Sequence, residues 1–208
     1  DELYRTITKW IAFASAPVLM VLLTYPGEFI ALLFGPQYLE GTNVLRVLVL
    51  GTFASILMGS AGGSLTSLGN NRVVLYTVTA AASLNVVLNV TLIPQLGIVG
   101  AGLATAISTA ALALFQASVL FKLHDLIPLG RLGVRTMAVS GAIGVLLYAI
   151  SSSNVVFTVV ATVLWGVVHG LSIVFLGVND RDKRIFVLIE DQLGVQIPFI
   201  RRLEIYQK

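Results

Sequence analysis

The sequence predicts an all-α integral membrane protein with about six transmembrane helices. This prediction is based on the composition of the chain and on the placement of its charged residues. Of its 208 residues, 57% are hydrophobic and only 11% are charged, whereas an average soluble domain has about 25% charged residues. No Asp, Glu, Lys or Arg occurs between Arg72 and Lys122. That stretch is long enough for two crossings, since one crossing takes about 20 apolar residues.

Breaks of proline, glycine or charge divide the chain into six charge-poor segments, each predicted to cross the membrane as a helix. These segments cover about residues 10–25, 47–68, 73–93, 98–121, 136–150 and 155–178, with a short apolar piece, 29–34, after the first. Residues 1–178 are therefore predicted to form one six-helix transmembrane domain. Residues 179–208 mix basic and apolar side chains, which predicts a cytoplasmic amphipathic tail at the membrane surface. A short soluble tail without function is the alternative.

The basic residues predict the orientation, because Lys and Arg accumulate in cytoplasmic loops. With six spans, every one of the 13 basic residues except Arg46 falls on the same side. Arg46 shares the opposite side with Glu28 and Glu40. The sequence therefore predicts a multi-pass protein of the cell membrane with both termini in the cytoplasm.

Four polar residues in or near the predicted spans are candidates for contact with a substrate or ion. Asn85 and Asn89 lie one helical turn apart and so face the same side, which favours interhelical hydrogen bonds or, alternatively, substrate contact. Arg46 is the candidate for binding an anion, although an Arg at the end of a span commonly extends to the headgroups. Glu28 is the candidate for ion coupling, although its place at the end of a span favours a hydrated interface.

The sequence predicts no enzyme active site. It has no cysteine, which excludes disulfides, thiolate metal sites and cysteine nucleophiles. His124 and His169 lack metal-ligand spacing, and no catalytic set of Ser, His and Asp or phosphate-binding glycine loop is recognisable, so no cofactor or metal is predicted. The formal net charge of +3 is too small to indicate a nucleic-acid partner. Small residues at 59–64 and 97–105 predict close packing of helices.

Residues 92–105, LIPQLGIVGAGLAT, together with the preceding Asn85 and Asn89, resemble a signature of polysaccharide-export flippases. These proteins belong to the multidrug/oligosaccharidyl-lipid/polysaccharide transporter superfamily. Other matching pieces follow the expected order: Trp10 with Pro17, residues 33–35 with Tyr38, residues 45–48, and residues 68–69 with Arg72. The resemblance covers about residues 1–125, and the last two predicted spans match in pattern only.

The resemblance implies the C-terminal part of a two-lobe transporter, including the polysaccharide biosynthesis C-terminal domain. Such a flippase moves a lipid-linked oligosaccharide or polysaccharide repeat unit from the cytoplasmic to the external leaflet. Because alternating access needs one bundle to rock against another, we expect the missing N-terminal lobe to come from a longer parent chain or a complex. The lipid phosphate would then contact Arg46, the sugar would contact Asn85 and Asn89, and the lipid tail would stay among membrane lipids.

Three other functions remain open at the level of the sequence. A multidrug or cation antiporter of the same superfamily would need an acid within the membrane, and only Glu28 could serve. A membrane-embedded glycosyl- or acyltransferase would use catalytic groups at a membrane surface, where His124 and Asp125 form the available pair. The third is a partner subunit that does not itself transport.

Overall fold

The computed structural model describes residues 2–127, 138 and 155–173, and within these ranges every regular element is a helix. The elements are α1 (Glu2–Thr24), α2 (Pro26–Leu33), the 3₁₀ helix η1 (Pro36–Gly41), α3 (Thr42–Leu57), α4 (Ala61–Ser67), α5 (Asn71–Leu96), α6 (Ile98–His124) and α8 (Val155–Ser172). Four described stretches are long and apolar enough to cross a membrane: Tyr4–Thr24, Pro36–Ser67, Asn71–Leu96 and Ile98–His124. The predicted fold class, an all-α integral membrane protein, is confirmed.

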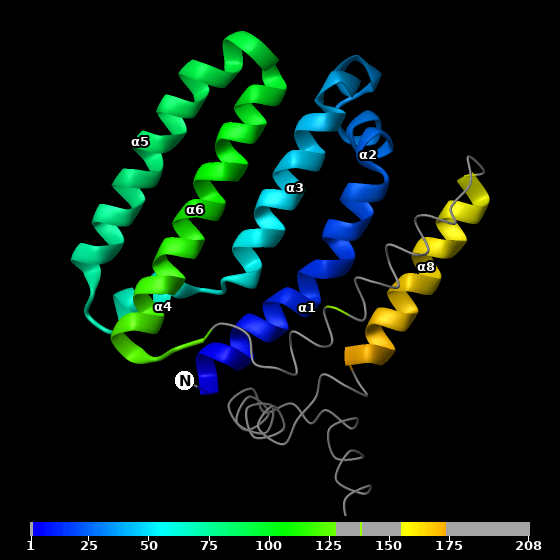
Figure 1. The fold of residues 1–208 in the computed structure, drawn as a ribbon. Helices are drawn as coiled ribbons and strands as arrows, with labels where there is room; N and C mark the ends of the chain where they lie inside the picture. Colours follow the sequence, from blue (N-terminus) through cyan, green and yellow to red (C-terminus); the bar gives the residue numbers. More distant parts are fainter. Residues whose placement is uncertain (1, 128–137, 139–154, 174–208) are drawn as a thin grey trace, which may run out of the picture.

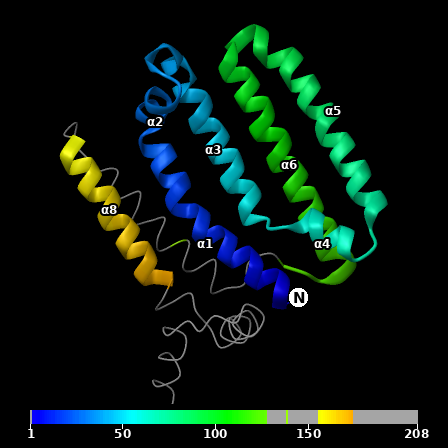
Figure 2. The ribbon, with the colours of Figure 1, turned by 180° about the vertical axis from the view of Figure 1, so that it is seen from behind.

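The long helices lie side by side in a row. Figure 1 shows the order α5, α6, α3, α1, and α8 packs beside α1 at the end of the row. The view from behind shows the same order (Figure 2), with the short α4 lying against the lower parts of α5 and α6. The inner helices α6 and α3 therefore contact neighbours on two opposite sides, and the two broad faces of the row are not covered by the other long described helices.

Glycines bring α3 and α6 into close contact. A Cβ atom added to Gly51 of α3 would lie 2.6 Å from the Cβ of Ala106, and one added to Gly102 of α6 would lie 3.0 Å from Cγ1 of Val44. Lipid provides no hydrophobic force between helices, so such backbone approach supplies the packing energy. The prediction that small residues of the fourth segment serve close packing is confirmed at Gly102.

The second predicted span, residues 47–68, is not one helix, and this corrects the sequence-based prediction. Helix α3 ends at Leu57 and α4 begins at Ala61. Between them Gly59 has a φ of +71°, a left-handed conformation that a side chain would oppose. The hydroxyl of Tyr4 on α1 donates a hydrogen bond to the carbonyl oxygen of Met58 at 2.9 Å, which satisfies a backbone group released by the break.

Two prolines were predicted to end helices, and the structure shows different outcomes. Pro26 occupies the first position of α2, directly after α1, where its missing N–H costs no helical hydrogen bond. Helix α5 continues through Pro94 to Leu96, about one turn beyond the predicted end. Gly97, with a φ of +57°, then makes the turn into α6.

The later predicted segments lie largely outside the described residues. Of the fifth span, residues 136–150, the structure describes only residue 138. Helix α8 covers the first part of the sixth span, and residues 174–178 and the tail, 179–208, lie outside the described ranges. The described residues thus contain four stretches that are long and apolar enough to cross a membrane, where the sequence predicts six spans in the whole chain.

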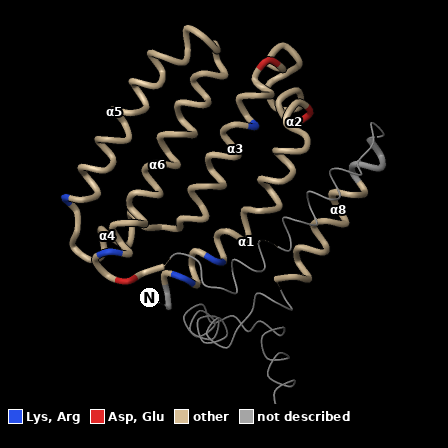
Figure 3. Tube along the Cα trace, in the orientation of Figure 1, with Lys and Arg blue, Asp and Glu red and all other residues tan. Residues whose placement is uncertain are grey.

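Charged residues gather at the two ends of the row (Figure 3). By the bounds of the helices, one end holds Arg5, Lys9, Arg72, Lys122 and Asp125, and the other holds Glu28, Glu40 and Arg46. This is the segregation on which the predicted orientation depends, because basic residues mark the cytoplasmic ends of spans.

Candidate functional site

Arg46 lies in the second turn of α3 and its side chain is exposed. Its Nη1 donates a hydrogen bond to Oδ1 of Asn43 at 3.2 Å, one turn earlier on the same helix. No carboxylate forms a salt bridge with Arg46 within the described ranges. A guanidinium group has five N–H donors. The bond to the neutral amide of Asn43 uses one of them and leaves most of the guanidinium donors for another acceptor.

The direction of Arg46 follows from its position on α3. Val44 and Leu48, two residues away on each side, line a cavity of about 430 Å³ between α2, η1 and α3. Two residues along an α-helix correspond to a rotation of about 200°. Arg46 therefore points away from that cavity, toward the face of α3 that also carries the exposed Leu50.

Glu28 lies at the end of the row that also holds Arg46. It is exposed in the first turn of α2, where a carboxylate interacts favourably with the helix dipole. Glu40 is exposed in η1 nearby in the sequence. The position of Glu28 at a helix start agrees with the interfacial alternative raised from the sequence.

Asn85 and Asn89 come together in the structure with Ser108. Nδ2 of Asn85 on α5 donates to Oγ of Ser108 on α6 at 3.0 Å. Nδ2 of Asn89 donates to both the backbone oxygen and Oδ1 of Asn85, each at 2.9 Å. Both asparagines are half-buried, and Ser108 is buried. The bond from Asn85 to Ser108 is the interhelical hydrogen bond weighed for the asparagines, whereas the bonds of Asn89 stay within α5. No described hydrogen bond joins this cluster to Arg46.

A second buried polar pair connects the same two helices and was missed from the sequence. Nε2 of Gln116 donates to Oγ1 of Thr77 at 3.0 Å, and both side chains are buried. A Cβ atom on Gly62 of α4 would lie 2.7 Å from Oε1 of Gln116, so α4 closes over this amide. The signal was present, since Gln116 is an amide within the charge-free stretch, like Asn85 and Asn89.

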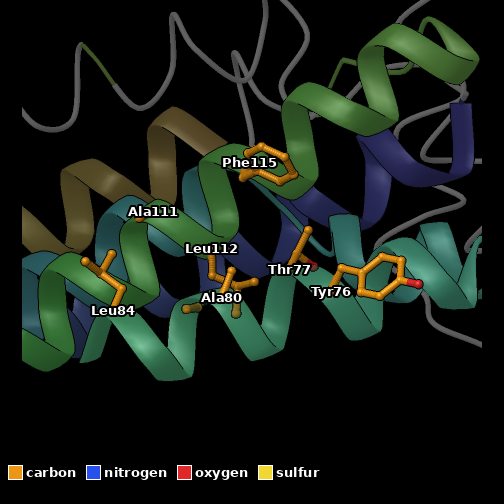
Figure 4. A pocket seen from close by; sticks show the side chains of 8 residues that line it. Tyr76, Thr77, Ala80, Leu84, Ala111, Leu112 and Phe115 are labelled. Atoms are coloured by element: carbon orange, nitrogen blue, oxygen red, sulfur yellow. The ribbon is translucent and has the colours of Figure 1, made fainter. Parts of the chain in front are cut away.

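An apolar groove of about 350 Å³ lies between α5 and α6. Figure 4 shows the side chains of Tyr76, Thr77, Ala80, Leu84, Ala111, Leu112 and Phe115 along it. Thr77 supplies the polar atom at its floor, and that hydroxyl is already bonded to Gln116 and to the carbonyl oxygen of Val74. The groove therefore presents an apolar surface.

The two histidines, His124 and His169, lie in different surroundings. His124 is exposed at the end of α6, and its Nε2 lies 3.1 Å from Nδ2 of Asn70. Asp125 follows in a left-handed conformation with φ of 54°. His169 is buried on α8 and stacks on Trp165, with ring centroids 5.2 Å apart and an angle of 11° between the planes. These contacts give His169 a role in helix packing.

Comparison with known proteins supports the membrane assignment at a coarse level. A stretch of 109 residues, 52% of the chain, is 27% identical to an uncharacterized membrane protein of Methanocaldococcus jannaschii. The matched stretch spans 22% of that protein's length. No protein-family profile matches the chain, and no solved structure matches it. The chain is thus similar to part of an archaeal membrane protein.

Proposed function

We propose that the chain forms part of a membrane flippase that translocates lipid-linked oligosaccharide or polysaccharide repeat units from the cytoplasmic to the external leaflet. One observation carries the proposal. Arg46 is an exposed cation in the second turn of a membrane-spanning helix, and its described hydrogen bond is to a neutral amide. Such a group is suited to the phosphate or diphosphate that joins the lipid to the sugar.

The chemistry of the guanidinium favours this role. Its planar fork binds two phosphate oxygens at once, and such charge-assisted hydrogen bonds are about twice as strong as neutral ones. Asn43 already bonds one edge of the guanidinium at 3.2 Å. The Arg46 side chain therefore loses fewer conformations when a phosphate binds. An Arg that merely extends to headgroups has no need of that contact.

The arrangement of helices is compatible with alternating access. The row leaves its broad faces without cover from the other long described helices, and Arg46 projects from one of them. We expect the missing lobe, in a longer parent chain or a complex, to face the row across a central site. In the described ranges Asn89 Oδ1 accepts no hydrogen bond, so it can accept one from a sugar hydroxyl.

The other functions have less support. Coupled efflux would need an acid in the membrane, and Glu28 lies exposed at a helix start. A transferase reaction would depend on His124 and Asp125, and His124 is already hydrogen-bonded to Asn70. The proposal therefore assigns no catalytic residue to the chain.

A binding experiment tests the role of Arg46. The intact protein in detergent is titrated with radiolabelled farnesyl diphosphate, and Arg46→Gln and Arg46→Lys are compared with Arg5→Gln, a charge loss at the opposite end. A charge-assisted hydrogen bond contributes about 1.5–3 kcal/mol, so Arg46→Gln should weaken binding roughly 10-fold or more. Arg46→Lys should retain part of the affinity, and Arg5→Gln should retain all of it. Equal affinity of wild type and Arg46→Gln would contradict the proposal.

A further inference from the structure

The groove between α5 and α6 is an exposed apolar channel on helices that span the membrane. Tyr76 and Phe115 at its rim are 69% and 58% exposed, and Ala80, Ala111 and Leu112 form its walls. The hydroxyl of Thr77 is bonded on both sides, and the other side-chain hydroxyl of the groove is the phenol of Tyr76 at its rim. In a bilayer this surface meets hydrocarbon chains.

Two cations lie at one end of this groove. Helices α5 and α6 are antiparallel neighbours joined at Gly97, so Arg72 in the first turn of α5 and Lys122 in the last turn of α6 lie at the same end. Arg72 precedes Tyr76 by one helical turn, and Lys122 follows Phe115 by two turns. The helical period therefore places each cation on the side of its helix that carries the groove.

The charges around the two cations leave an excess of positive charge. Both side chains are exposed, and neither forms a salt bridge within the described ranges. The exposed carboxylate of Asp125 follows the end of α6, and His124 is hydrogen-bonded to Asn70. Two cations beside one carboxylate can still bind an anion.

We propose that this groove binds an anionic phospholipid, with an acyl chain between α5 and α6 and the phosphate between Arg72 and Lys122. The apolar channel matches the acyl chain, and the cations match the headgroup, because anionic lipids attract basic residues near the membrane surface. Tyr76, one turn from Arg72, has the amphipathic character of side chains at the membrane interface. A phospholipid is favoured because these helices are surrounded by phospholipid at high concentration. The proposal does not depend on transport.

Native mass spectrometry of the intact protein tests the site. The protein is equilibrated in detergent with equal amounts of phosphatidylglycerol and phosphatidylcholine that carry the same acyl chains, and retained lipids are counted. We expect phosphatidylglycerol to be retained at least 5-fold over phosphatidylcholine. The double variant R72Q/K122Q should bring this ratio close to 1, whereas R5Q, which removes a charge at the same end from α1, should leave it unchanged.

A second pair of variants tests the groove itself. Ala80→Phe fills the channel from α5 and Ala111→Leu fills it from α6, so each should lower retention of phosphatidylglycerol while the cations remain. Size-exclusion profiles and circular dichroism identify any variant that does not fold, and the other variant then decides. Wild type without a lipid preference, or an R72Q/K122Q variant that keeps it, would overturn the proposal. Displacement of phosphatidylglycerol by equimolar undecaprenyl phosphate would overturn the assignment to a phospholipid.

Discussion

Nε2 of His169 lies 3.1 Å from the carbonyl oxygen of Phe13, the carbonyl that Pro17 leaves without a helical donor. Proline has no N–H, so the residue four positions earlier loses its partner within the helix. In a bilayer no water replaces that partner, and the N–H of His169 on α8 donates instead. Stacking on Trp165 holds the imidazole ring in place. One hydrogen bond thus attaches α8 to α1 at the proline.

A double-mutant cycle on His169 and Pro17 tests this relationship. His169→Ala leaves the Phe13 carbonyl unsatisfied and should lower the free energy of unfolding by about 1–3 kcal/mol. In the Pro17→Ala background the restored N–H of residue 17 bonds to Phe13, so the same change should cost less. Both costs are measured by denaturant unfolding in detergent. Equal costs in the two backgrounds would show that His169 acts through its other contacts.

Substitution of Gly51 should disrupt the packing of α3 on α6. In Gly51→Val the new Cβ atom would fall 2.6 Å from the Cβ of Ala106, so the helices must separate. We expect a loss of about 1–3 kcal/mol, the usual cost of overpacking, seen as a lower midpoint of thermal unfolding. The matched control is Gly41→Ala, whose Cβ meets only Cδ1 of Ile30 at 3.5 Å. A Gly51→Val protein as stable as Gly41→Ala would be inconsistent with the described packing.

The asparagine cluster allows structural and substrate-binding roles to be separated. Ser108→Ala removes the acceptor of Asn85 and should lower stability by about 0.6 kcal/mol, the average for such bonds in membranes. Asn89→Ala should cost a similar amount and, in addition, reduce transport per folded molecule if Asn89 contacts the sugar. Stability is measured by unfolding and transport by flux in proteoliposomes. Unchanged transport in Asn89→Ala would assign this residue to packing alone.

The sequence predicted the fold class because length and apolar composition are what a bilayer selects. It did not predict the break at Gly59, because a positive φ depends on the contact of the α3–α4 link with Tyr4 and Thr8 of α1. The sequence also predicts a helix end at Pro94, and the helix continues past it.

Side-chain pairing was predictable only in part. The one-turn spacing of Asn85 and Asn89 correctly placed both on one side of α5, but not against Ser108, since the register between two helices is set by packing. The pairing of Gln116 with Thr77 depends on the same register. Arg46 stood out through charge segregation alone, whereas its contact with Asn43 required coordinates.

Cysteine accessibility tests the predicted orientation directly, because the chain has no cysteine of its own. Gln37→Cys in η1 and Gln95→Cys before the turn at Gly97 should react in intact cells with a membrane-impermeant maleimide. Asn71→Cys, at the opposite end of α5, should react only after permeabilisation. The three positions are exposed. Labelling of Asn71→Cys in intact cells, with Gln37→Cys protected, would reverse the orientation.

A translocation assay on the intact protein in proteoliposomes tests the proposed flippase function. A fluorescent disaccharide joined to undecaprenyl diphosphate is placed in one leaflet, and its arrival in the other is followed by quenching with a membrane-impermeant reductant. We predict transfer that depends on the protein and falls at least 10-fold in Arg46→Gln, with partial activity in Arg46→Lys. Transfer by wild type no faster than in protein-free liposomes would contradict the proposed function, and transfer unaffected by Arg46→Gln would contradict the role of Arg46.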